Sequence, residues 1–517
     1  MRRLWMAMCV LAPVGCGGGG GGASSQPEQP IRGLLQKRSI PGTEGMAVFD
    51  MHRRADGMLL LVVGSTEGGA KLRPTQVITI DPVSATRSAE SEPIALPTNE
   101  SFQNMAVDSE GRVFVLTIST LGGKVRVYGK EGGGSPSMSR DLPIMNVPVP
   151  SGKIGIWSMT SGRVAVDQSG HVEIAAALRF SEVVLSSLDP VPTLQPSLST
   201  SASSLYIVPT FDSTQPLSLA TITTTTTTRE TSTFESTATK DLSQSFLEPS
   251  LLTTIENTAT WICLATFSAS SELEWGSVRK YWEKTALNSF GVDHILADSG
   301  ADDQDSRTWI VGRHLTTDVF VLCVDRLGAT IHPDTFATAT FADETWGGRG
   351  IEASPVASGA LDLNTGLLGE LGKTAPALDS EGGLLLALTI KRDDRTTAVG
   401  MVRFERQSAR IEDHGIAIRS FMAGEVMFLQ SAGVATGGAA IAMVTSDPHT
   451  GENLHALHRV VESGRDLGFA ADGVLDLGAA SGAALVLASS SSEHLYAISQ
   501  EMDFDGIDRL FVKDIAP

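Results

Sequence analysis

Three aspartates near the C-terminus are candidate calcium ligands. Asp503, Asp505 and Asp508 lie in the segment DFDGID, and Gly506 stands between them directly before the apolar run RLFV. Carboxylate oxygens at alternating positions, with a glycine that allows a bend, suit Ca²⁺. The spacing predicts a weak Ca²⁺ site, and the alternative is a solvated turn that begins a strand.

Two other groups of residues could bind a metal ion, but their spacing favours this less. A second acidic loop before RTWIVG contains Asp298, Asp302, Asp303 and Asp305. Three histidines, His449, His455 and His458, follow one another in DPHTGENLHALHRV. On a strand, residues three apart point to opposite faces, so His455 and His458 would diverge. We expect a solvated turn at the second acidic loop and no metal site at the three histidines.

Familiar catalytic motifs are missing from the sequence. There is no G-x-S-x-G segment, which argues against a serine hydrolase of the α/β type. The run from Gly366 to Thr374 ends in GKT, as a phosphate-binding loop does. However, Gly366 stands one residue further from Gly372 than the spacing of that loop allows. We therefore assign no catalytic residue and no cofactor other than the predicted Ca²⁺.

The elements that would position these residues are predicted to be strands. Apolar runs of five to seven residues recur between Gly, Asp, Ser and Thr clusters, such as MLLLVV at 58–63, VFVLTI at 113–118 and LLLALTI at 384–390. Short runs bounded by turn residues favour strands over helices. The best helix candidate is Leu273–Leu287, where a strand hairpin is nearly as well supported. In the Ser/Thr-rich segment 190–260 we favour an exposed strand over a flexible stalk.

A recurring turn organises these strands. Asp108–Gly111, Asp167–Gly170 and Asp379–Gly382 each precede an apolar run, and Asp56-Gly57 and Asp472-Gly473 are shorter versions. The aspartate can accept backbone N–H groups ahead of it, and the glycine supplies a positive φ. The first three intervals between these turns are 52, 59 and 212 residues, and the last is close to four repeats of 53.

A turn-and-strand unit that repeats about every 50 residues is typical of β-propellers. VDSEGRVFVL and VDQSGHVEIA resemble the repeats of NHL-like bacterial propellers, and DFDGID resembles a shortened calcium loop of integrin-like propellers. We predict an all-β fold, a propeller of seven or eight blades over residues 36–517. The alternative is two β-sandwich domains.

The N-terminus carries an export signal. Arg2 and Arg3 precede a short apolar stretch that ends at Cys16, and six glycines and ASSQPEQP follow. The segment is too short to span a bilayer permanently. It resembles a bacterial lipoprotein signal, which implies a signal peptide over 1–15, acylation of Cys16 and a tether over 16–35. The alternative is an ordinary secreted protein with an incidental cysteine.

The charge narrows the classes of partner. The 517 residues carry a formal charge of −20, which argues against nucleic-acid binding because phosphates would be repelled. We expect a protein that is anchored in membrane lipid through acylated Cys16 at the bacterial cell envelope, on the outer membrane or the periplasmic face. Its expected partner is an envelope glycan or protein.

Two classes of function stay open at this stage. The first is a binding or scaffold module, and the second is a propeller lyase or hydrolase that acts on an extracellular polymer. A polar channel with carboxylates and histidines would favour the enzyme. A loop face lined by Trp157, Trp261, Trp309 or Trp346 would favour glycan binding. We expect these tryptophans to be core residues between blades.

Overall fold

The fold was examined in a computed structural model of the chain. It describes, with short gaps inside these ranges, residues 33–186, 252–331, 339–364 and 374–516. The described residues form strands and turns with no helix among them, which confirms the prediction of an all-β fold. Nor is there, in this part of the chain, a helix long and apolar enough to cross a membrane.

The described strands form seven sheets, numbered here in chain order. Sheet 1 contains β2 (Met46–Arg53), β3 (Leu59–Ser65), β4 (Gln76–Asp81), β5 (Thr86–Arg87) and β6 (Ile94–Ala95). Sheet 2 contains β7 (Ser101–Val107), β8 (Val113–Ser119), β9 (Gly122–Tyr128) and β10 (Met138–Asp141). Sheet 3 contains β11 (Gly155–Val166), β12 (His171–Ser186), β13 (Leu252–Ser268) and β14 (Arg279–Thr285).

The second half of the chain forms the other four sheets. Sheet 4 contains β15 (Phe290–Asp298), β16 (Arg307–His314), β17 (Asp318–Val324), β18 (Ala339–Thr340), β19 (Gly350–Pro355) and β20 (Leu361–Asn364). Sheet 5 contains β22 (Ala377–Leu378), β23 (Leu384–Lys391), β24 (Thr396–Phe404), β25 (Ile411–Asp413) and β26 (Ser420–Met422). Sheet 6 contains β21 (Thr374–Ala375), β27 (Val426–Gly433), β28 (Ala439–Ser446), β29 (Asn453–Val461), β30 (Gly464–Arg465) and β31 (Val474–Ala480). Sheet 7 combines β32 (Leu485–Ser489), β33 (Leu495–Met502) and β34 (Asp508–Ala516) with β1 (Gly33–Ser39).

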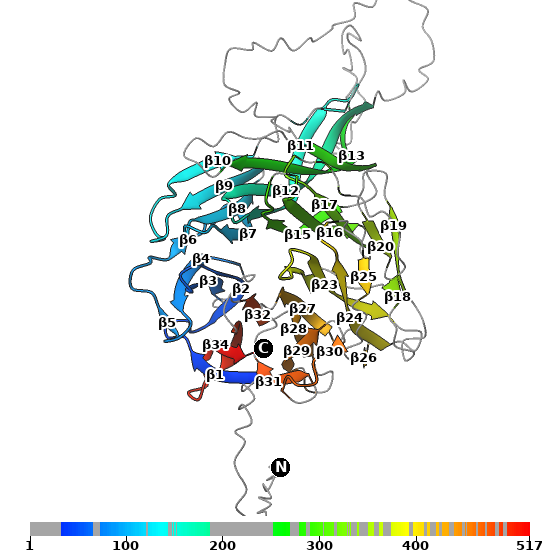
Figure 1. The fold of residues 1–517 in the computed structure, drawn as a ribbon. Helices are drawn as coiled ribbons and strands as arrows, with labels where there is room; N and C mark the ends of the chain where they lie inside the picture. The colour runs from blue at the N-terminus through cyan, green and yellow to red at the C-terminus, as the bar shows by residue number, and fades with distance from the viewer. Residues whose placement is uncertain are drawn as a thin grey trace, which may run out of the picture.

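The sheets are arranged in a ring, each packed against the next (Figure 1). Separate apolar clusters fill the interfaces between sheets 1 and 2, 2 and 3, 3 and 4, 5 and 6, 6 and 7, and 7 and 1. Between sheets 4 and 5, Trp309 packs against Phe404 with ring centroids 6.0 Å apart. This rotational arrangement is a β-propeller, because each sheet buries both faces only against its two neighbours. It also excludes the alternative of two sandwich domains.

The two ends of the described chain close the ring. β1 pairs antiparallel with β34, so that Gly33 lies opposite Ala516 and Ser39 opposite Phe511. The first strand therefore completes the last sheet. Because β1 begins at Gly33, the predicted boundary between the tether and the propeller, at 35/36, falls inside this strand.

The recurring Asp-Gly turn connects the first and second strands of four sheets. In sheet 2, Asp108 Oδ1 accepts the backbone N–H groups of Glu110 and Arg112, at 3.0 and 2.8 Å. Gly111 then adopts a φ of 83°, a region that favours glycine. The same φ near 80° occurs at Gly170 and Gly382 in sheets 3 and 5. The physical interpretation of the motif is confirmed at these turns.

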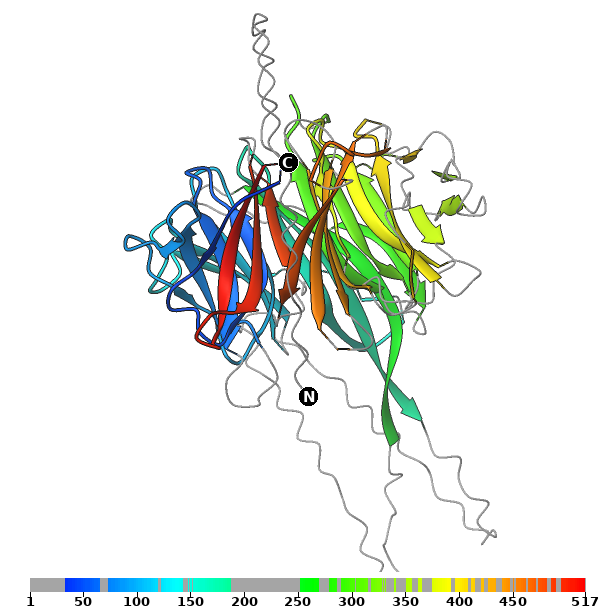
Figure 2. The ribbon, with the colours of Figure 1, turned by 90° about the horizontal axis from the view of Figure 1, so that it is seen from below.

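The inference of four repeats between Asp167 and Asp379 is wrong. Asp167 belongs to sheet 3 and Asp379 to sheet 5, so the 212 residues between them cover two sheets rather than four repeats. Part of this length is the connection between β12 and β13, two strands of 16 and 17 residues that extend beyond the ring on one side (Figure 2). The Thr-rich run at 223–228 lies outside the described residues.

The prediction of a helix over Leu273–Leu287 is wrong for Arg279–Thr285, the part that the structure describes. Arg279–Thr285 is β14, whose residues pair with β13, and the rest of the segment lies outside the described residues. β-Sheet pairing with a long neighbouring strand outweighs the weak helical spacing of Val278 and Trp282.

Among the side chains that the structure describes, two tryptophans and two cysteines are buried in the core. Trp261 and Trp309 are 5% and 0% exposed, and Trp157 packs against Phe180 and Trp261, whereas Trp346 lies outside the described residues. Cys263 and Cys323 are both buried, and no disulfide joins them. No tryptophan-lined loop face is present among the described residues.

Candidate functional site

The innermost strands of the propeller surround a central cavity of about 410 Å³. Its walls come from the first strands of sheets 1 to 4, namely β2, β7, β11 and β15, and from β22 and β27. Since six strands from far apart in the sequence contribute, the cavity is a product of the ring closure.

The inner strands share an irregularity that shapes this cavity. The pairing of β2, β7, β11, β15 and β27 with the next strand shifts by one residue, as in a β-bulge, at Phe49, Gln103, Thr160, Asp293 and Met427. A bulge bends the strand and re-aims side chains, and bulges are frequent next to functional sites. In β2 and β7 the bulged residues Phe49 and Gln103 line the cavity.

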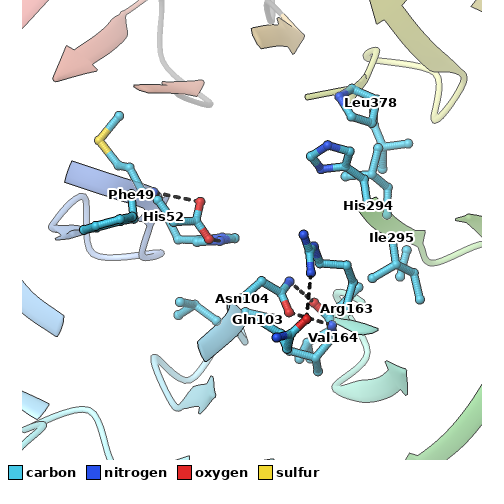
Figure 3. A pocket seen from close by; sticks show the side chains of 18 of the residues that line it. Phe49, His52, Gln103, Asn104, Arg163, Val164, His294, Ile295 and Leu378 are labelled. Atoms are coloured by element: carbon cyan, nitrogen blue, oxygen red, sulfur yellow. Dashed lines mark hydrogen bonds and ion pairs between the residues drawn. The ribbon is translucent and has the colours of Figure 1, made fainter. Parts of the chain in front are cut away.

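Polar side chains from different sheets gather around the cavity (Figure 3). The polar lining consists of Asp50, His52, Gln103, Asn104, Arg163, His294 and Gln430. The apolar part of the wall includes Phe49, Phe102, Ile295 and Leu378. The volume falls within the range of about 300–1,000 Å³ that is usual for small-molecule sites, and the mixture of groups is also typical of them.

Asn104 joins two inner strands where no backbone pairing exists between them. Its Nδ2 donates to the carbonyl oxygen of Val164 and its Oδ1 accepts the N–H of the same residue, both at 2.9 Å. The amide thus imitates a backbone partner for β11. It fixes the position of β11 beside β7 and so holds the neighbouring Arg163.

Arg163 is held by groups from three sheets. Its Nε donates to the carbonyl oxygen of the bulged residue Asp293 at 2.6 Å, and one terminal nitrogen donates to the carbonyl oxygen of Gly162 at 2.8 Å. The same nitrogen lies 3.4 Å from Gln103 Oε1. The guanidinium group is therefore oriented at the cavity wall before any ligand arrives, and a guanidinium stays charged at all relevant pH values.

Asp50 and His52 form an ion pair on β2. His52 Nε2 lies 3.3 Å from Asp50 Oδ2. Burial lowers the pKa of His52, but the Asp50 carboxylate outweighs it, so the pKa lies above its usual value. A histidine with this pairing can hold or release a proton near neutral pH.

The predicted calcium residues do not line the cavity and lie at the turn between β33 and β34. Arg509 pairs with both Asp503 and Asp505, and its hydrogen bond to Asp505 holds the pKa of that carboxyl group below its usual range. Asp508 begins β34, and its Oδ1 is buried without a hydrogen-bond partner. In the part of the chain that the structure describes, no group of three or more His, Cys, Asp or Glu side chains could hold a metal ion. The Ca²⁺ site stays a prediction.

The other polar groups singled out in the sequence have structural partners. Arg406 pairs with Asp298 and Asp305 across the interface between sheets 4 and 5, and Asp302 Oδ1 caps its own turn. His455 and His458 are buried on strand β29 of sheet 6, the strand setting in which their spacing predicts that they diverge. Asp303, His449 and the predicted lipidation site Cys16 lie outside the described residues.

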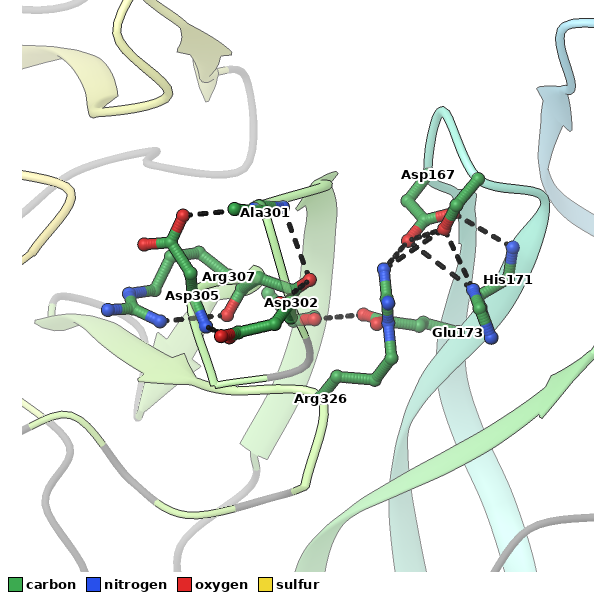
Figure 4. Close-up of polar contacts among 12 residues, drawn as sticks. Asp167, His171, Glu173, Ala301, Asp302, Asp305, Arg307 and Arg326 are labelled. Atoms are coloured by element: carbon green, nitrogen blue, oxygen red, sulfur yellow. Dashed lines mark hydrogen bonds and ion pairs between the residues drawn. The ribbon is translucent and has the colours of Figure 1, made fainter.

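A second polar cluster lies between sheets 3 and 4 (Figure 4). Glu173 on β12 is 2% exposed and accepts a hydrogen bond from the hydroxyl group of Thr308 on β16. Close by, Arg326 donates to the carboxylate of Asp167. Burial raises the pKa of Glu173 to about 7, because the charged form loses its hydration there. The cluster joins two sheets and is separate from the cavity.

No family model matches this chain. A comparison with curated proteins also finds no match. Solved structures with similar folds include the polysaccharide lyase Uly1, at 9% identity and a TM-score of 0.38, where the match covers 93% of this chain and 91% of that one. A protein of unknown function from Bacteroides caccae matches at 10% identity and a TM-score of 0.32, over 81% of this chain and 97% of its own.

A third similar structure is the Trypanosoma rangeli sialidase, at 8% identity and a TM-score of 0.28. That match covers 93% of this chain and 59% of the sialidase. At these identities and TM-scores, the activities of the similar proteins are not carried over to this chain.

The sequence reasoning missed the cavity residues. Asp50, His52, Asn104, Arg163 and His294 are scattered over 245 positions and belong to no spaced motif. The one sequence feature that could have indicated them is the presence of polar residues in the first strands of the sheets, as in SFQNMAV at 101–107. Such residues also occur on solvated strand faces, so they identify a site only after the ring has placed them together.

Proposed function

We propose that this protein is an exported binding module, anchored at the cell envelope through acylated Cys16, whose ligand site is the central cavity. The observation that carries the proposal is the gathering of polar side chains from five inner strands around one cavity of about 410 Å³. A propeller can present such a cavity on a rigid scaffold without any catalytic step.

The site can be tested by filling the cavity. Gln430 lines it, so Gln430→Trp should occlude it, whereas Gln168→Trp places the same bulk in an exposed turn of sheet 3. In a pull-down of envelope glycans and proteins by the mature chain, Gln430→Trp should lose the captured partner and Gln168→Trp should keep it. Equal capture by both variants would refute a ligand site in the cavity.

The anchor is tested separately. Cys16→Ser should release the protein from the membrane fraction, because acyl chains on this cysteine would supply the membrane affinity. Retention of the variant in the membrane fraction, at the level of the unchanged protein, would refute the proposed lipidation.

A second candidate function is a propeller enzyme that acts on an extracellular polymer. The observation that favours it is the Asp50–His52 pair together with His294 in the same cavity, since general acid–base catalysis needs such groups close to a substrate. If the protein cleaves a polymer, a reducing-end assay should detect products, and His52→Asn should abolish them while the melting temperature stays unchanged. No product with any envelope polysaccharide leaves the binding module as the function.

A further inference from the structure

We propose that the ligand of the central cavity is an uncharged sugar, with a hydroxyl group that bonds to His52 and a ring that lies against Phe49. This inference rests on the proposed function, because it names the ligand class of the same cavity. It follows from the charges of the lining, from one nitrogen atom of His52 and from an exposed aromatic ring.

The charges of the cavity lining cancel. Among the described residues that line it, Arg163 is the one Lys or Arg, and Asp50 is the one Asp or Glu. Both carboxylate oxygens of Asp50 already have a partner within the protein. Its Oδ1 accepts the backbone N–H of Met51 at 2.9 Å, and its Oδ2 lies beside the imidazole of His52.

The guanidinium group of Arg163 is likewise engaged by the protein. Its nitrogen atoms contact the carbonyl oxygens of Asp293 and Gly162 and the side-chain oxygen of Gln103. A charged ligand would lose its hydration in the cavity and would meet only charged groups that the protein itself already uses. The lining therefore favours a ligand without net charge.

His52 offers a hydrogen-bond acceptor to such a ligand. Its Nε2 lies 3.3 Å from Asp50 Oδ2, and a carboxylate only accepts hydrogen bonds, so the neutral imidazole carries its proton on Nε2. Its Nδ1 is then an acceptor, and this imidazole forms no other hydrogen bond with the described residues. An apolar ligand would bury Nδ1 without a donor, which costs binding free energy, whereas a hydroxyl group would donate to it.

Phe49 offers an apolar surface on the same strand. It is the bulged residue of β2, it is 37% exposed, and it lines the cavity (Figure 3). An aromatic ring of this kind gains free energy when an apolar surface covers it. A sugar combines C–H groups on the face of its ring with hydroxyl groups at the edge. It can therefore satisfy Phe49 and His52 together, which neither an apolar compound nor a small polar one does.

The test uses isothermal titration calorimetry at pH 7.5. The probes are D-glucose, D-galactose and D-mannose, together with the C6 carboxylate and the C6 amine of each, which place a negative or a positive charge on the same ring. Cyclohexanol is the apolar probe of similar ring size. We expect at least one hexose to bind about tenfold more tightly than its two charged counterparts and than cyclohexanol, or better.

Two variants assign the binding to β2. Phe49→Leu removes the aromatic ring and should weaken hexose binding about tenfold, whereas Phe504→Leu, which changes an exposed ring at the turn between β33 and β34, should leave it unchanged. His52→Phe removes the acceptor and should also weaken hexose binding about tenfold. Its control is His494→Phe, because His494 forms an ion pair with Asp514 outside the cavity lining.

The outcomes separate this proposal from the proposed function. If no hexose binds, or if a charged counterpart binds as tightly as its hexose, the uncharged sugar is wrong. Cyclohexanol binding as tightly as the hexose overturns the sugar as well. Hexose binding that survives in both Phe49→Leu and His52→Phe overturns the assigned contacts. In each case the cavity stays the ligand site if Gln430→Trp loses the captured partner and Gln168→Trp keeps it, whereas equal capture by these two variants refutes the proposed function.

Discussion

Replacing Glu173 with glutamine should remove a pH dependence from the stability of the propeller. Glu173 is buried between sheets 3 and 4, and its pKa in the folded protein is about 7, raised from 4.5. The folded state therefore binds a proton that the unfolded state releases at lower pH. The free energy of unfolding falls as the pH rises from about 4.5 to about 7, because the unfolded chain then binds fewer protons than the folded one.

The size of the effect follows from the raised pKa. A difference of about 2.5 pKa units corresponds to about 3 kcal/mol at pH values above both pKa values. Glutamine keeps an oxygen that accepts the hydroxyl group of Thr308 but cannot ionise. Glu173→Gln should therefore gain about 3 kcal/mol of stability over the unchanged protein between pH 4 and pH 8.

Urea unfolding at pH 4, 6 and 8 measures this gain. The matched control is Glu90→Gln, which changes an exposed carboxyl group and should keep a constant difference from the unchanged protein. A difference between Glu173→Gln and the unchanged protein that stays flat from pH 4 to 8, or that falls with rising pH, would refute the reasoning about burial.

Three further predictions concern the turn, the core and the calcium residues. Asp108→Ala removes the acceptor of two backbone N–H groups in the first turn of sheet 2. It should lower the free energy of unfolding, measured with urea, by about 1–3 kcal/mol. A loss of less than about 0.5 kcal/mol would contradict the role of the motif. Trp309→Ala leaves a large space between sheets 4 and 5 and should cost about 3–5 kcal/mol by the same measurement, and a smaller loss than for Asp108→Ala would argue against a packed interface there. If Asp503, Asp505 and Asp508 bind Ca²⁺, millimolar Ca²⁺ should raise the melting temperature and EGTA should reverse the rise, whereas a melting temperature indifferent to both removes the site.

The strands and their turns could be predicted because their causes are local. An Asp-x-x-Gly segment and the apolar run that follows it carry their physical reason within about ten residues. The turns at Asp108, Asp167 and Asp379 form as the motif predicts. Rotational repetition also followed from this local unit, since one sheet cannot bury both of its faces alone.

The number and order of the sheets could not be predicted from the sequence, because they depend on insertions and on pairing between strands far apart in the chain. For example, the triplet TWI occurs twice in the sequence, at 260–262 and at 308–310, which looks like a repeat. The first copy lies on the third strand of sheet 3 and the second copy on the second strand of sheet 4, so the recurrence is no structural repeat. The pairing of β1 with β34 joins residues more than 470 positions apart and has no local signal.

The cavity could not be predicted for the same physical reason. Asn104 bridges to Val164, and Arg163 to Asp293, only because the ring places β7, β11 and β15 side by side. The acidic loops drew attention because their residues are close in sequence, yet their carboxylates pair with Arg406 and Arg509. In this propeller, proximity in sequence indicates turns, and the convergence of inner strands produces the site.

A crystal structure of the mature chain with the partner that it captures from the envelope tests the central claim most directly. If the central cavity is the ligand site, the bound partner should contact its polar lining, for example at His52, Asn104 and Gln430. An empty cavity, together with the partner bound only at the outer strands, would contradict the claim.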